Sequence, residues 1–410
     1  MKVGIVTTWY ERGAAYVSWQ LRAALVNSGN DVFIFSRHFC PDLETTSRWS
    51  AEYVTRASRQ RSPMPTDINK KEFITWLTKN NISVVLFNEQ HYWRPIIWAK
   101  QIGVKTIAYV DYYTEKTVPA FKLYDQIWCN TKRHFSVFKH FEQATYIPWG
   151  TETSCFIPVE KPENPTGDSV TFFHSAGMSP YRKGTDLLLI AAAKLARRAV
   201  KFKLIIHTQV SLESAMPATK EYINDLQAQG YLTVIEKTIS SPGLYHLGDV
   251  YVYPSRLEGI GLTIAEAQAV GLPTIVTNEP PMTEFCSEFC KTIDVETRHS
   301  RADGYYWPLS IASTDDLAIK MEEFIDCECL ENIKKRVRSH AEEKLSWEKN
   351  STQLHALIEG CEQYPIDPAS VKTSSAIDFA KLPYFENFKW VYYALYDIHQ
   401  IFKKIKAQLA

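Results

Sequence analysis

The segment YVYPSRLEGIGLTIAEAQAVGLPTIVT, residues 251–277, contains an apolar run, a glycine-containing turn, a helical stretch and a second apolar run. That order is typical of a strand, a crossover helix and the next strand of a parallel sheet. Gly259 and Gly261 stand at the turn, where residues without a side chain let a ligand approach the backbone. The helix expected over roughly 263–270 would present unpaired N–H groups and the positive end of its dipole. The segment therefore predicts an anion site suited to a phosphate.

Two glutamates flank this turn. Glu258 precedes the glycines and Glu266 lies on the expected helix, with seven residues between them. A carboxylate there can accept two hydrogen bonds from a cis-diol such as ribose. Acidic residues are also favoured at helix starts for stability alone, but the glycines between the two acids, and Gly271 with Pro273 after them, favour binding. We therefore predict that one loop and one helix hold diphosphate, ribose and sugar together.

The same alternation of short apolar runs and helical stretches extends outward over most of the chain. It pauses at a segment rich in Pro, Gly and Thr, residues 144–169, and then restarts. The pattern predicts an α/β protein with two doubly wound, Rossmann-like domains facing a central cleft. In such sheets ligands bind beyond the carboxyl ends of the strands, so the residues that follow each strand are the candidates for chemistry.

Length and composition fit two globular cores. The chain has 410 residues, of which 45% are hydrophobic and 22% charged. Residues 1–13 begin as a buried strand and not as a signal peptide, and no run approaches the roughly 20 apolar residues that cross a bilayer. Eight cysteines lack metal or disulfide-framework spacing, which indicates reduced thiols. We expect a cytoplasmic protein without a bound metal and without a nucleic-acid partner.

Charge is balanced over the whole chain but not along it. Residues 1–150 hold 19 Lys and Arg against 12 Asp and Glu, a balance of 19 − 12 = +7, which leaves −7 for the other 260 residues. A basic first half is compatible with an anionic partner such as a membrane surface or an acidic acceptor, and equally with chance surface bias.

The run EGIGLTIAEAQAVGLP, residues 258–273, resembles the signature of retaining, nucleotide-sugar-dependent glycosyltransferases of family four. Their pattern E-G-x-G-L-x-x-x-E-A-x-x-x-G-x-P is matched without departure. The resemblance implies the GT-B architecture. It implies that Glu266 binds the ribose, that Glu258 approaches the donor sugar, and that the amides around Gly261 and Leu262 face the diphosphate.

Further blocks extend the resemblance to roughly residues 1–362. In SAGMSPYRKGTDLLLIAAAKL, residues 175–195, Lys183 matches the family's diphosphate-binding lysine. The family's arginine is replaced by Met178; the neighbouring Arg182 is either its substitute or a solvated surface residue. The segments IPWGTETSCFIP and SWEKNSTQLHALIEG resemble the family's linker and its closing helix, which crosses back to the first domain.

The first half departs further from the family. Its first loop, TTWYERGAAYVSWQL, carries Gly13 where the family usually has a glycine pair. By position, Asp111 stands where the family often has a histidine near the donor sugar. Asp111 could accept a hydrogen bond from a sugar hydroxyl or stabilise positive charge at the anomeric carbon, and Glu89 and His91 are further candidates for this region. For each of these three residues a structural or acceptor-binding role remains equally open.

The last 48 residues lie beyond the resemblance. Residues 364–383 are expected to form an extended connector. Residues 389–410 place apolar side chains at helical spacing and lysines near the end, which is typical either of an interfacial membrane helix or of a helix packed on the body or on another subunit. The apolar positions are Val391, Ala394, Leu395, Ile398, Phe402, Ile405 and Leu409.

These patterns predict a first domain over residues 1–150, a nucleotide-sugar-binding domain over 151–345, a crossing helix over 346–362 and an extension over 363–410. The resemblance implies transfer of a sugar from a UDP or GDP sugar to a saccharide or lipid-linked acceptor hydroxyl, with retention of anomeric configuration. No further cofactor is expected. Bacterial surface polysaccharide or glycolipid assembly fits the basic first half. A nucleotide-sugar epimerase, a phosphorylase and a non-catalytic nucleotide-sugar-binding subunit remain alternatives.

Overall fold

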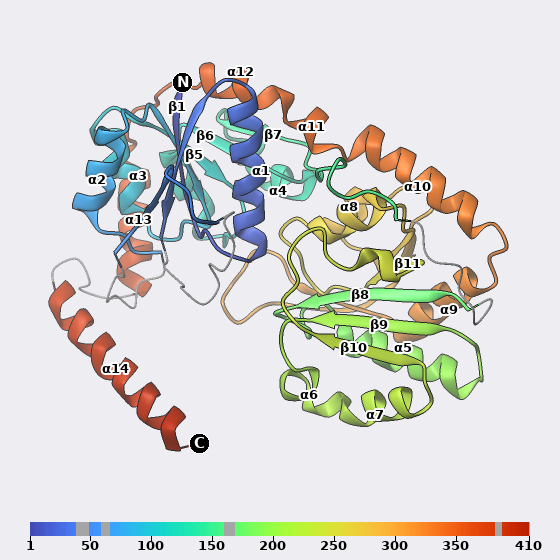
Figure 1. The fold of residues 1–410 in the computed structure, drawn as a ribbon. Helices are drawn as coiled ribbons and strands as arrows, with labels where there is room; N and C mark the ends of the chain where they lie inside the picture. Colours follow the sequence, from blue (N-terminus) through green and yellow to red (C-terminus); the bar gives the residue numbers. More distant parts are fainter. Residues whose placement is uncertain (38–48, 59–65, 160–168, 382–387, 410) are drawn as a thin grey trace. The chain divides into compact units, whose positions relative to one another are not determined.

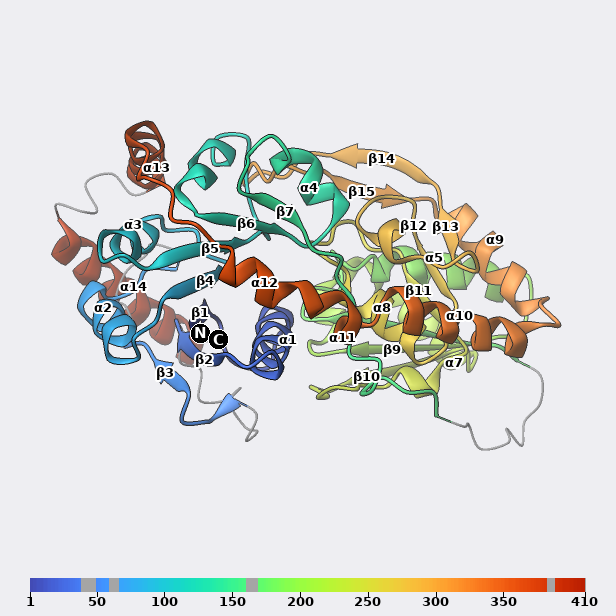
Figure 2. The ribbon, with the colours of Figure 1, turned by 90° about the horizontal axis from the view of Figure 1, so that it is seen from above.

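A computed structural model describes residues 1–37, 49–58, 66–159, 169–381 and 388–409. The chain divides into two compact units (Figures 1 and 2). Unit 1 consists of residues 1–130, 134–147 and 351–410, and unit 2 of residues 131–133 and 148–350.

Unit 1 is built on a sheet of seven parallel strands in the order β3-β2-β1-β4-β5-β6-β7. The strands are almost wholly apolar because helices cover both faces. Gly4 in β1 lets the ring of Trp76 approach, since a Cβ at this glycine would lie 2.5 Å from that ring. The strands are β1 (Lys2–Thr7), β2 (Asp31–Ser36), β3 (Val54–Arg56), β4 (Val84–Asn88), β5 (Lys105–Tyr109), β6 (Gln126–Cys129) and β7 (Ala144–Tyr146).

The helices of unit 1 include a group contributed by the end of the chain. Among these, α12 packs on α1, where the side chains of Asn30 and His355 lie 3.1 Å apart. The helices are α1 (Gly13–Asn27), α2 (Lys70–Lys79), α3 (Arg94–Gln101), η3 (Val118–Leu123), α4 (Lys132–Phe138, shared with unit 2), η7 (Ser351–Gln353), α12 (Leu354–Glu359), α13 (Pro368–Lys381) and α14 (Lys389–Leu409).

Unit 2 contains a six-stranded parallel sheet in the order β10-β9-β8-β11-β12-β13. The chain runs outward from β8 in one direction and from β11 in the other, so the carboxyl ends of these two adjacent strands form the switch point of the sheet. The strands are β8 (Thr171–Gly177), β9 (Lys203–Thr208), β10 (Leu232–Glu236), β11 (Val250–Tyr253), β12 (Thr274–Thr277) and β13 (Lys291–Ile293), with a separate antiparallel pair, β14 (Val295–His299) and β15 (Leu309–Ala312).

The core of unit 2 lies between this sheet and its helices, with α5 packed on α9 and α7. The Trp149 and Trp347 rings, 4.1 Å apart between centroids, join the linker to α11. The helices are α5 (Thr185–Arg197), α6 (Leu212–Ala215), η4 (Pro217–Thr219), α7 (Lys220–Ala228), η5 (Tyr245–Leu247), α8 (Leu262–Ala269), η6 (Met282–Phe285), α9 (Thr314–Ile325), α10 (Leu330–Lys344) and α11 (Trp347–Asn350).

The predicted pair of doubly wound sheets is confirmed. The extended connector predicted over residues 364–383 is wrong, because α13 occupies most of it. Asp367 accepts a hydrogen bond from the Ser370 amide at 2.9 Å, as an N-cap does, and Pro368 starts the helix. The buried face of α13 carries Ser370, Ser374 and Asp378, one turn apart. A search for apolar periodicity does not detect a helix whose inner face is polar.

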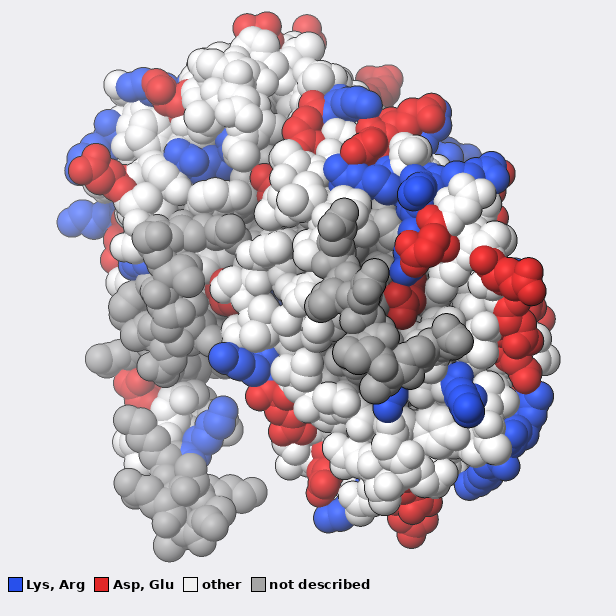
Figure 3. Space-filling view, turned by 45° about the vertical axis from the view of Figure 1, so that its right-hand side comes forward, with Lys and Arg blue, Asp and Glu red and all other residues white. Residues whose placement is uncertain are grey.

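No helix among the described residues is both long and apolar enough to span a membrane. On the face drawn in Figure 3, acidic and basic side chains are interspersed and no continuous basic patch dominates the view.

Candidate functional site

Two loops of unit 2 meet at the switch point of its sheet. One loop, residues 178–184, follows β8, and the other, residues 254–261, follows β11. At Gly184, which has a φ of +71°, a Cβ would overlap the carbonyl oxygen of Pro254. The Arg256 amide donates to the Arg182 carbonyl oxygen at 2.8 Å. The two loops are therefore held against each other through their backbones.

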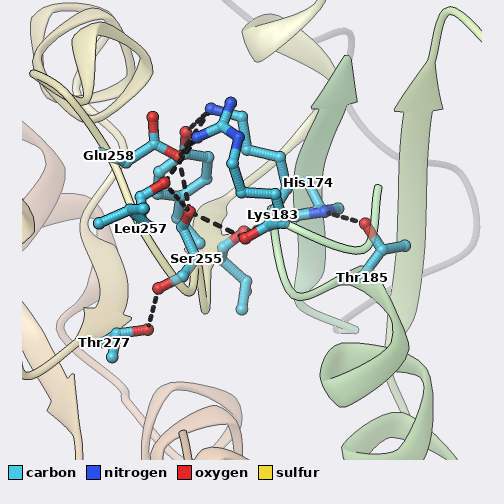
Figure 4. A network of polar contacts seen from close by, with 10 residues as sticks. His174, Lys183, Thr185, Ser255, Leu257, Glu258 and Thr277 are labelled. Carbon is cyan, nitrogen blue, oxygen red and sulfur yellow. Dashed lines mark hydrogen bonds and ion pairs between the residues drawn. The ribbon is translucent and has the colours of Figure 1, made fainter. Parts of the chain in front are cut away.

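Glu258 is the centre of a charged cluster in these loops (Figure 4). Its Oε1 atom accepts hydrogen bonds from Arg182 Nη1 at 2.7 Å, Lys183 Nζ at 2.9 Å and Ser255 Oγ at 2.6 Å. The same Nη1 atom of Arg182 donates to the Leu257 carbonyl oxygen at 2.6 Å. Two cations and one carboxylate give the cluster a formal charge of 2 − 1 = +1.

Burial and charge act against each other in this cluster. Burial alone would raise the pKa of Glu258, but Arg182, Lys183 and the Ser255 hydroxyl outweigh it and lower that pKa to about 2. Burial, with Arg182 adding repulsion, lowers the pKa of Lys183 to about 8 even though Glu258 opposes the shift. The Glu258 charge raises the pKa of Arg182. At neutral pH Glu258 is thus ionised and both bases are charged.

Tyr253, the last residue of β11, contacts the ammonium group of Lys183. The Lys183 ammonium donates to the Tyr253 hydroxyl and lies 4.7 Å from the centre of its ring. Tyr253 is fully buried and stacks on Tyr251 at a centroid distance of 5.5 Å. Of the three N–H donors of an ammonium group, one is therefore on Tyr253 and one is on Glu258.

Glu266, on the first turns of α8, has a different environment. Its Oε2 atom accepts a hydrogen bond of 2.5 Å from the hydroxyl of the buried Tyr245. Burial raises the pKa of Glu266 to about 7, and this tyrosine only partly counteracts the shift. The carboxyl group therefore titrates near neutral pH, and it lies on the short helix that follows the glycine turn.

That turn has the predicted geometry. Gly261 precedes α8 with a φ of +85°, a left-handed conformation that favours glycine. The helix begins at Leu262, one residue before the predicted start. No atom lies within 4 Å of a Cβ built on Gly259, so the space beside this residue is open. The first amides of α8 have no acceptor within the helix and form its positive end.

Buried polar groups join the elements that carry the two loops (Figure 4). His174 Nδ1 lies 2.8 Å from the Val252 carbonyl oxygen, so it must donate its proton there. Nε2 of the same ring then accepts from the Thr185 hydroxyl at 2.8 Å. Burial lowers the pKa of His174 to about 4, which keeps the ring neutral. Strand β8, strand β11 and the start of α5 are thereby connected.

A second buried contact braces the same loops. Both terminal nitrogens of Arg256 donate to the Asp186 carboxylate at 2.7 Å, and the guanidinium lies 4.0 Å from the centre of the Tyr181 ring. A bidentate pair of this kind fixes orientation as well as distance. Loop 254–261 and the first turn of α5 are therefore held rigidly together.

In unit 1, polar residues gather beyond the carboxyl ends of β1, β2, β4 and β5. Arg12 contacts Glu89 at 3.5 Å, and Glu89 has an unusual φ of +56°. The buried Arg37 donates to Gln90 at 3.3 Å, and burial lowers its pKa to about 10. Gly13 is the first residue of α1, and nothing lies within 4 Å of a Cβ built there.

Asp111 lies in this group. Burial raises its pKa well above the usual range, and the Glu89 charge adds to the effect while Arg37 opposes it. The ring of His91 lies 5.0 Å from that of Tyr112, and burial lowers the His91 pKa to about 4. The structure thus brings Asp111, Glu89 and His91 together at one edge of the sheet in unit 1.

The structure brings together the predicted residues of unit 2 as well. Arg182, whose direction the sequence left open, points to Glu258 beside Lys183, whereas Met178 is exposed. Sequence reasoning missed Tyr245, Tyr253 and Ser255, which contact the predicted charges. The sequence signal for these residues is weak: the run VYVYPS only places Tyr253 at the end of a buried strand and Ser255 in the loop that follows it. Within the described part of the chain, no group of three His, Cys, Asp or Glu side chains is arranged to hold a metal ion.

Residues 169–295, which contain both loops and both glutamates, match the family model described as glycosyl transferases group 1. This segment is similar to group 1 glycosyltransferases. The chain is also similar to O-antigen biosynthesis glycosyltransferase WclY of Escherichia coli, which is 38% identical over 55 residues, 13% of this chain and 16% of WclY.

Mannosylfructose-phosphate synthase of Agrobacterium fabrum is 28% identical over 195 residues, 45% of this chain and 39% of the synthase. The chain thus spans at most 39% of the length of these two relatives. The fold of the chain is similar to that of HepE from Anabaena, solved in complex with UDP and glucose. The TM-score is 0.66 at 13% identity, covering 88% of this chain and all of HepE. The expected GT-B fold class is confirmed.

Proposed function

We propose that the protein is a retaining glycosyltransferase that moves a sugar from a nucleotide diphosphate sugar to an acceptor hydroxyl. One observation carries the proposal: Lys183 and Arg182 converge on Glu258 beside the open glycine turn before α8. The net positive charge and the helix start together suit a diphosphate. The matched family and the UDP complex of HepE support a nucleotide sugar as the ligand.

In this proposal different residues of unit 2 contact different parts of the donor. Glu266 accepts hydrogen bonds from the ribose, and the amides of Gly259, Gly261 and Leu262 face the diphosphate. Lys183 and Arg182 neutralise the charge that grows on the departing phosphate, which is the principal electrostatic contribution to the rate. Glu258 holds both cations through Oε1, and its second oxygen is available for a hydroxyl of the donor sugar.

The reaction that fits this arrangement is substitution on one face of the sugar. The departing phosphate oxygen helps to remove the proton of the acceptor hydroxyl, so the protein orients the reactants and stabilises charge. Because Lys183, Arg182 and the helix start supply positive charge, we propose that the reaction needs no metal ion and no further cofactor. A UDP or GDP sugar is the donor class.

We propose that unit 1 binds the acceptor and supplies Asp111 to the reacting centre. Its raised pKa leaves Asp111 largely protonated at neutral pH, so it can donate a hydrogen bond to a sugar oxygen. The small Gly13 lets the backbone of the first loop approach the donor. A saccharide or lipid-linked acceptor in surface polysaccharide assembly, reached in the cytoplasm at the inner face of the membrane, agrees with the relationship to WclY.

The test is a thermal-shift screen with UDP and GDP sugars, followed by assays with acceptors. A donor that binds the folded protein raises its stability by RT ln(1 + [L]/Kd). Glu266→Ala should abolish most of this stabilisation, and Lys183→Ala should mainly reduce turnover. Near-normal activity of both variants would refute the assigned site. Release of an altered sugar from the donor without any acceptor would indicate an epimerase.

A further inference from the structure

Helix α14 presents an apolar stripe to solvent. Residues at helical spacing along it are about half exposed or more: Leu395 (55%), Ile398 (49%), Phe402 (68%) and Ile405 (46%). Trp390, near the start of the helix, is 71% exposed. Large apolar side chains in a continuous exposed row mark a surface that binds something apolar.

The charge of α14 indicates the kind of partner. The helix contains four lysines, at positions 389, 403, 404 and 406, and one acid, Asp397, a balance of 4 − 1 = +3. On a helical projection, Lys389 and Lys403 lie opposite or beside the stripe. Lysine is depleted at protein–protein interfaces, whereas a basic polar face with an apolar face containing Trp or Phe is typical of helices that lie on membranes.

We propose that α14 binds the surface of an anionic lipid bilayer, lying parallel to it with the stripe of Leu395, Ile398, Phe402 and Ile405 in the acyl boundary. The 21 residues of the helix extend over roughly 31 Å. The mixture of charged and apolar residues excludes α14 from the candidates for a membrane span. Lys389 and Lys403 face the phosphate groups, where each contributes to binding through the negative surface potential.

Helix α13 connects this surface to the polar group of unit 1. It packs on η3, and its buried Asp378 lies near the backbone of Trp93, at the start of α3. Lys381, at the end of α13, is close enough to His91 to lower its pKa, although burial lowers it more. Beyond this, Lys389 Nζ lies 5.7 Å from the centre of the Tyr92 ring. Helix α14 therefore begins beside residues 91–93.

The location has a consequence that rests on the proposed function. Residues 91–93 follow the carboxyl end of β4, the same edge of the sheet that carries Asp111. A membrane-bound α14 therefore brings the acceptor side of unit 1 to the lipid surface. The acceptor is then a saccharide attached to a membrane lipid, and not a freely diffusing sugar.

The binding step is tested by flotation of the full chain with two kinds of vesicle, pure phosphatidylcholine and phosphatidylcholine mixed with phosphatidylglycerol. Binding should require the anionic lipid and weaken as salt is added. Phe402→Glu should reduce partitioning by on the order of tenfold or more, since it removes an aromatic side chain that the bilayer would bury. Gln400→Glu is the matched control, because it adds the same charge on the opposite face of the helix. Its partitioning to the vesicles should fall much less. Lys403→Gln should reduce binding roughly fivefold.

Other outcomes would overturn the proposal. If vesicles of neither composition bind the protein, or if both glutamate variants float alike, the stripe is not a lipid-binding face. If light scattering shows a dimer that Phe402→Glu dissociates, the stripe binds a second copy of the chain instead. Flotation needs neither a donor nor turnover, so its result is independent of the thermal-shift screen with donors. If the chain floats with the vesicles but binds no UDP or GDP sugar, this result would contradict only the proposed transferase function.

Discussion

The ammonium group of Lys183 lies 2.9 Å from Oε1 of Glu258, and this one oxygen also accepts a hydrogen bond from Arg182. The carboxylate thus holds two neighbouring cations that would otherwise repel each other in a buried place. The arrangement keeps positive charge at the glycine turn before any anion arrives. Removing a cation and removing the carboxylate should therefore have different consequences.

Lys183→Ala should lower kcat by about 10²–10³-fold, the usual cost of losing one group that stabilises transition-state charge. The KM for the donor should change much less, because Arg182 and the start of α8 still attract the diphosphate. Steady-state kinetics with a saturating acceptor would check this.

Lys194→Ala is the matched control. Lys194 lies on α5, the helix that follows the loop of Lys183, and is likewise paired with an acid, Asp315, but that ion pair is partly exposed and away from the two loops. Its replacement should leave kcat near the wild-type value. An equal loss in both variants would mean that Lys183 acts only through the stability of the fold.

Donor binding should strengthen as the pH rises through about 7, because Glu266 must lose a proton to accept two hydrogen bonds from a diol. The same raised pKa means that its contribution to the stability of the ligand-free protein is present below its unfolded pKa and is lost as pH rises through about 7. Calorimetric titration of a UDP or GDP sugar at several pH values measures the first effect. Glu266→Gln should bind weakly at every pH.

Tyr245→Phe provides an independent check on this titration. The Tyr245 hydroxyl stabilises the charged form of Glu266 through a 2.5 Å hydrogen bond. Without it the pKa of Glu266 should rise further, and the midpoint of the binding curve should move to higher pH. An unchanged midpoint would mean that another group is responsible for the pH dependence.

Tyr253→Phe should move the alkaline limb of the pH–rate profile to lower pH. Burial already lowers the pKa of Lys183 to about 8, and the Tyr253 hydroxyl is an acceptor for its charged form. Loss of that acceptor favours the neutral amine, so the active cation disappears at lower pH. A purely structural role would change the melting temperature and leave the profile in place.

Substitutions at the two glycines of the turn before α8 should distinguish effects on protein stability from effects on donor binding. Gly261→Ala forces a Cβ into a φ of +85° and should cost roughly 1–2 kcal/mol of unfolding free energy. Gly259→Ala has no φ penalty and open space around its Cβ, so stability should be retained. If the Gly259 amide faces the diphosphate, the added methyl should still weaken donor affinity. Denaturant unfolding and donor titration of both variants distinguish the two effects.

Asp111→Asn should keep more activity than Asp111→Ala. The raised pKa indicates a carboxyl group that is largely protonated at neutral pH, and an asparagine amide reproduces its hydrogen-bond donor. A comparison of kcat values at pH 7 measures the difference. Activity lost equally in both variants would indicate that the ionised carboxylate is required.

The sequence predicted the fold of unit 2 and the charges of its site because both depend on local order along the chain. Apolar runs alternate with helical stretches, and Glu258, Gly261 and Glu266 stand within nine residues. The direction of Arg182 depends on its contact with Glu258, 76 positions away, and spacing does not report it.

The remaining misses have similar causes. Tyr245 and Tyr253 look like ordinary apolar residues of a buried strand region until their hydroxyls are seen on Glu266 and Lys183. Helix α13 was missed because Ser370 and Ser374, and not apolar side chains, form much of its inner face. Both cases involve polar atoms whose partners lie on a different element.

Gly184 allows the two loops to lie in close contact. Because any larger residue there would collide with the carbonyl oxygen of Pro254, neither loop can shift without the other. If the two loops bind the diphosphate as proposed, their backbone already has the required shape, and little conformational freedom is lost when the nucleotide binds. Changes in the preferred sugar or base must then come from the side chains around these two loops. A new donor preference should therefore be attainable by substituting those side chains without changing the backbone of the turn.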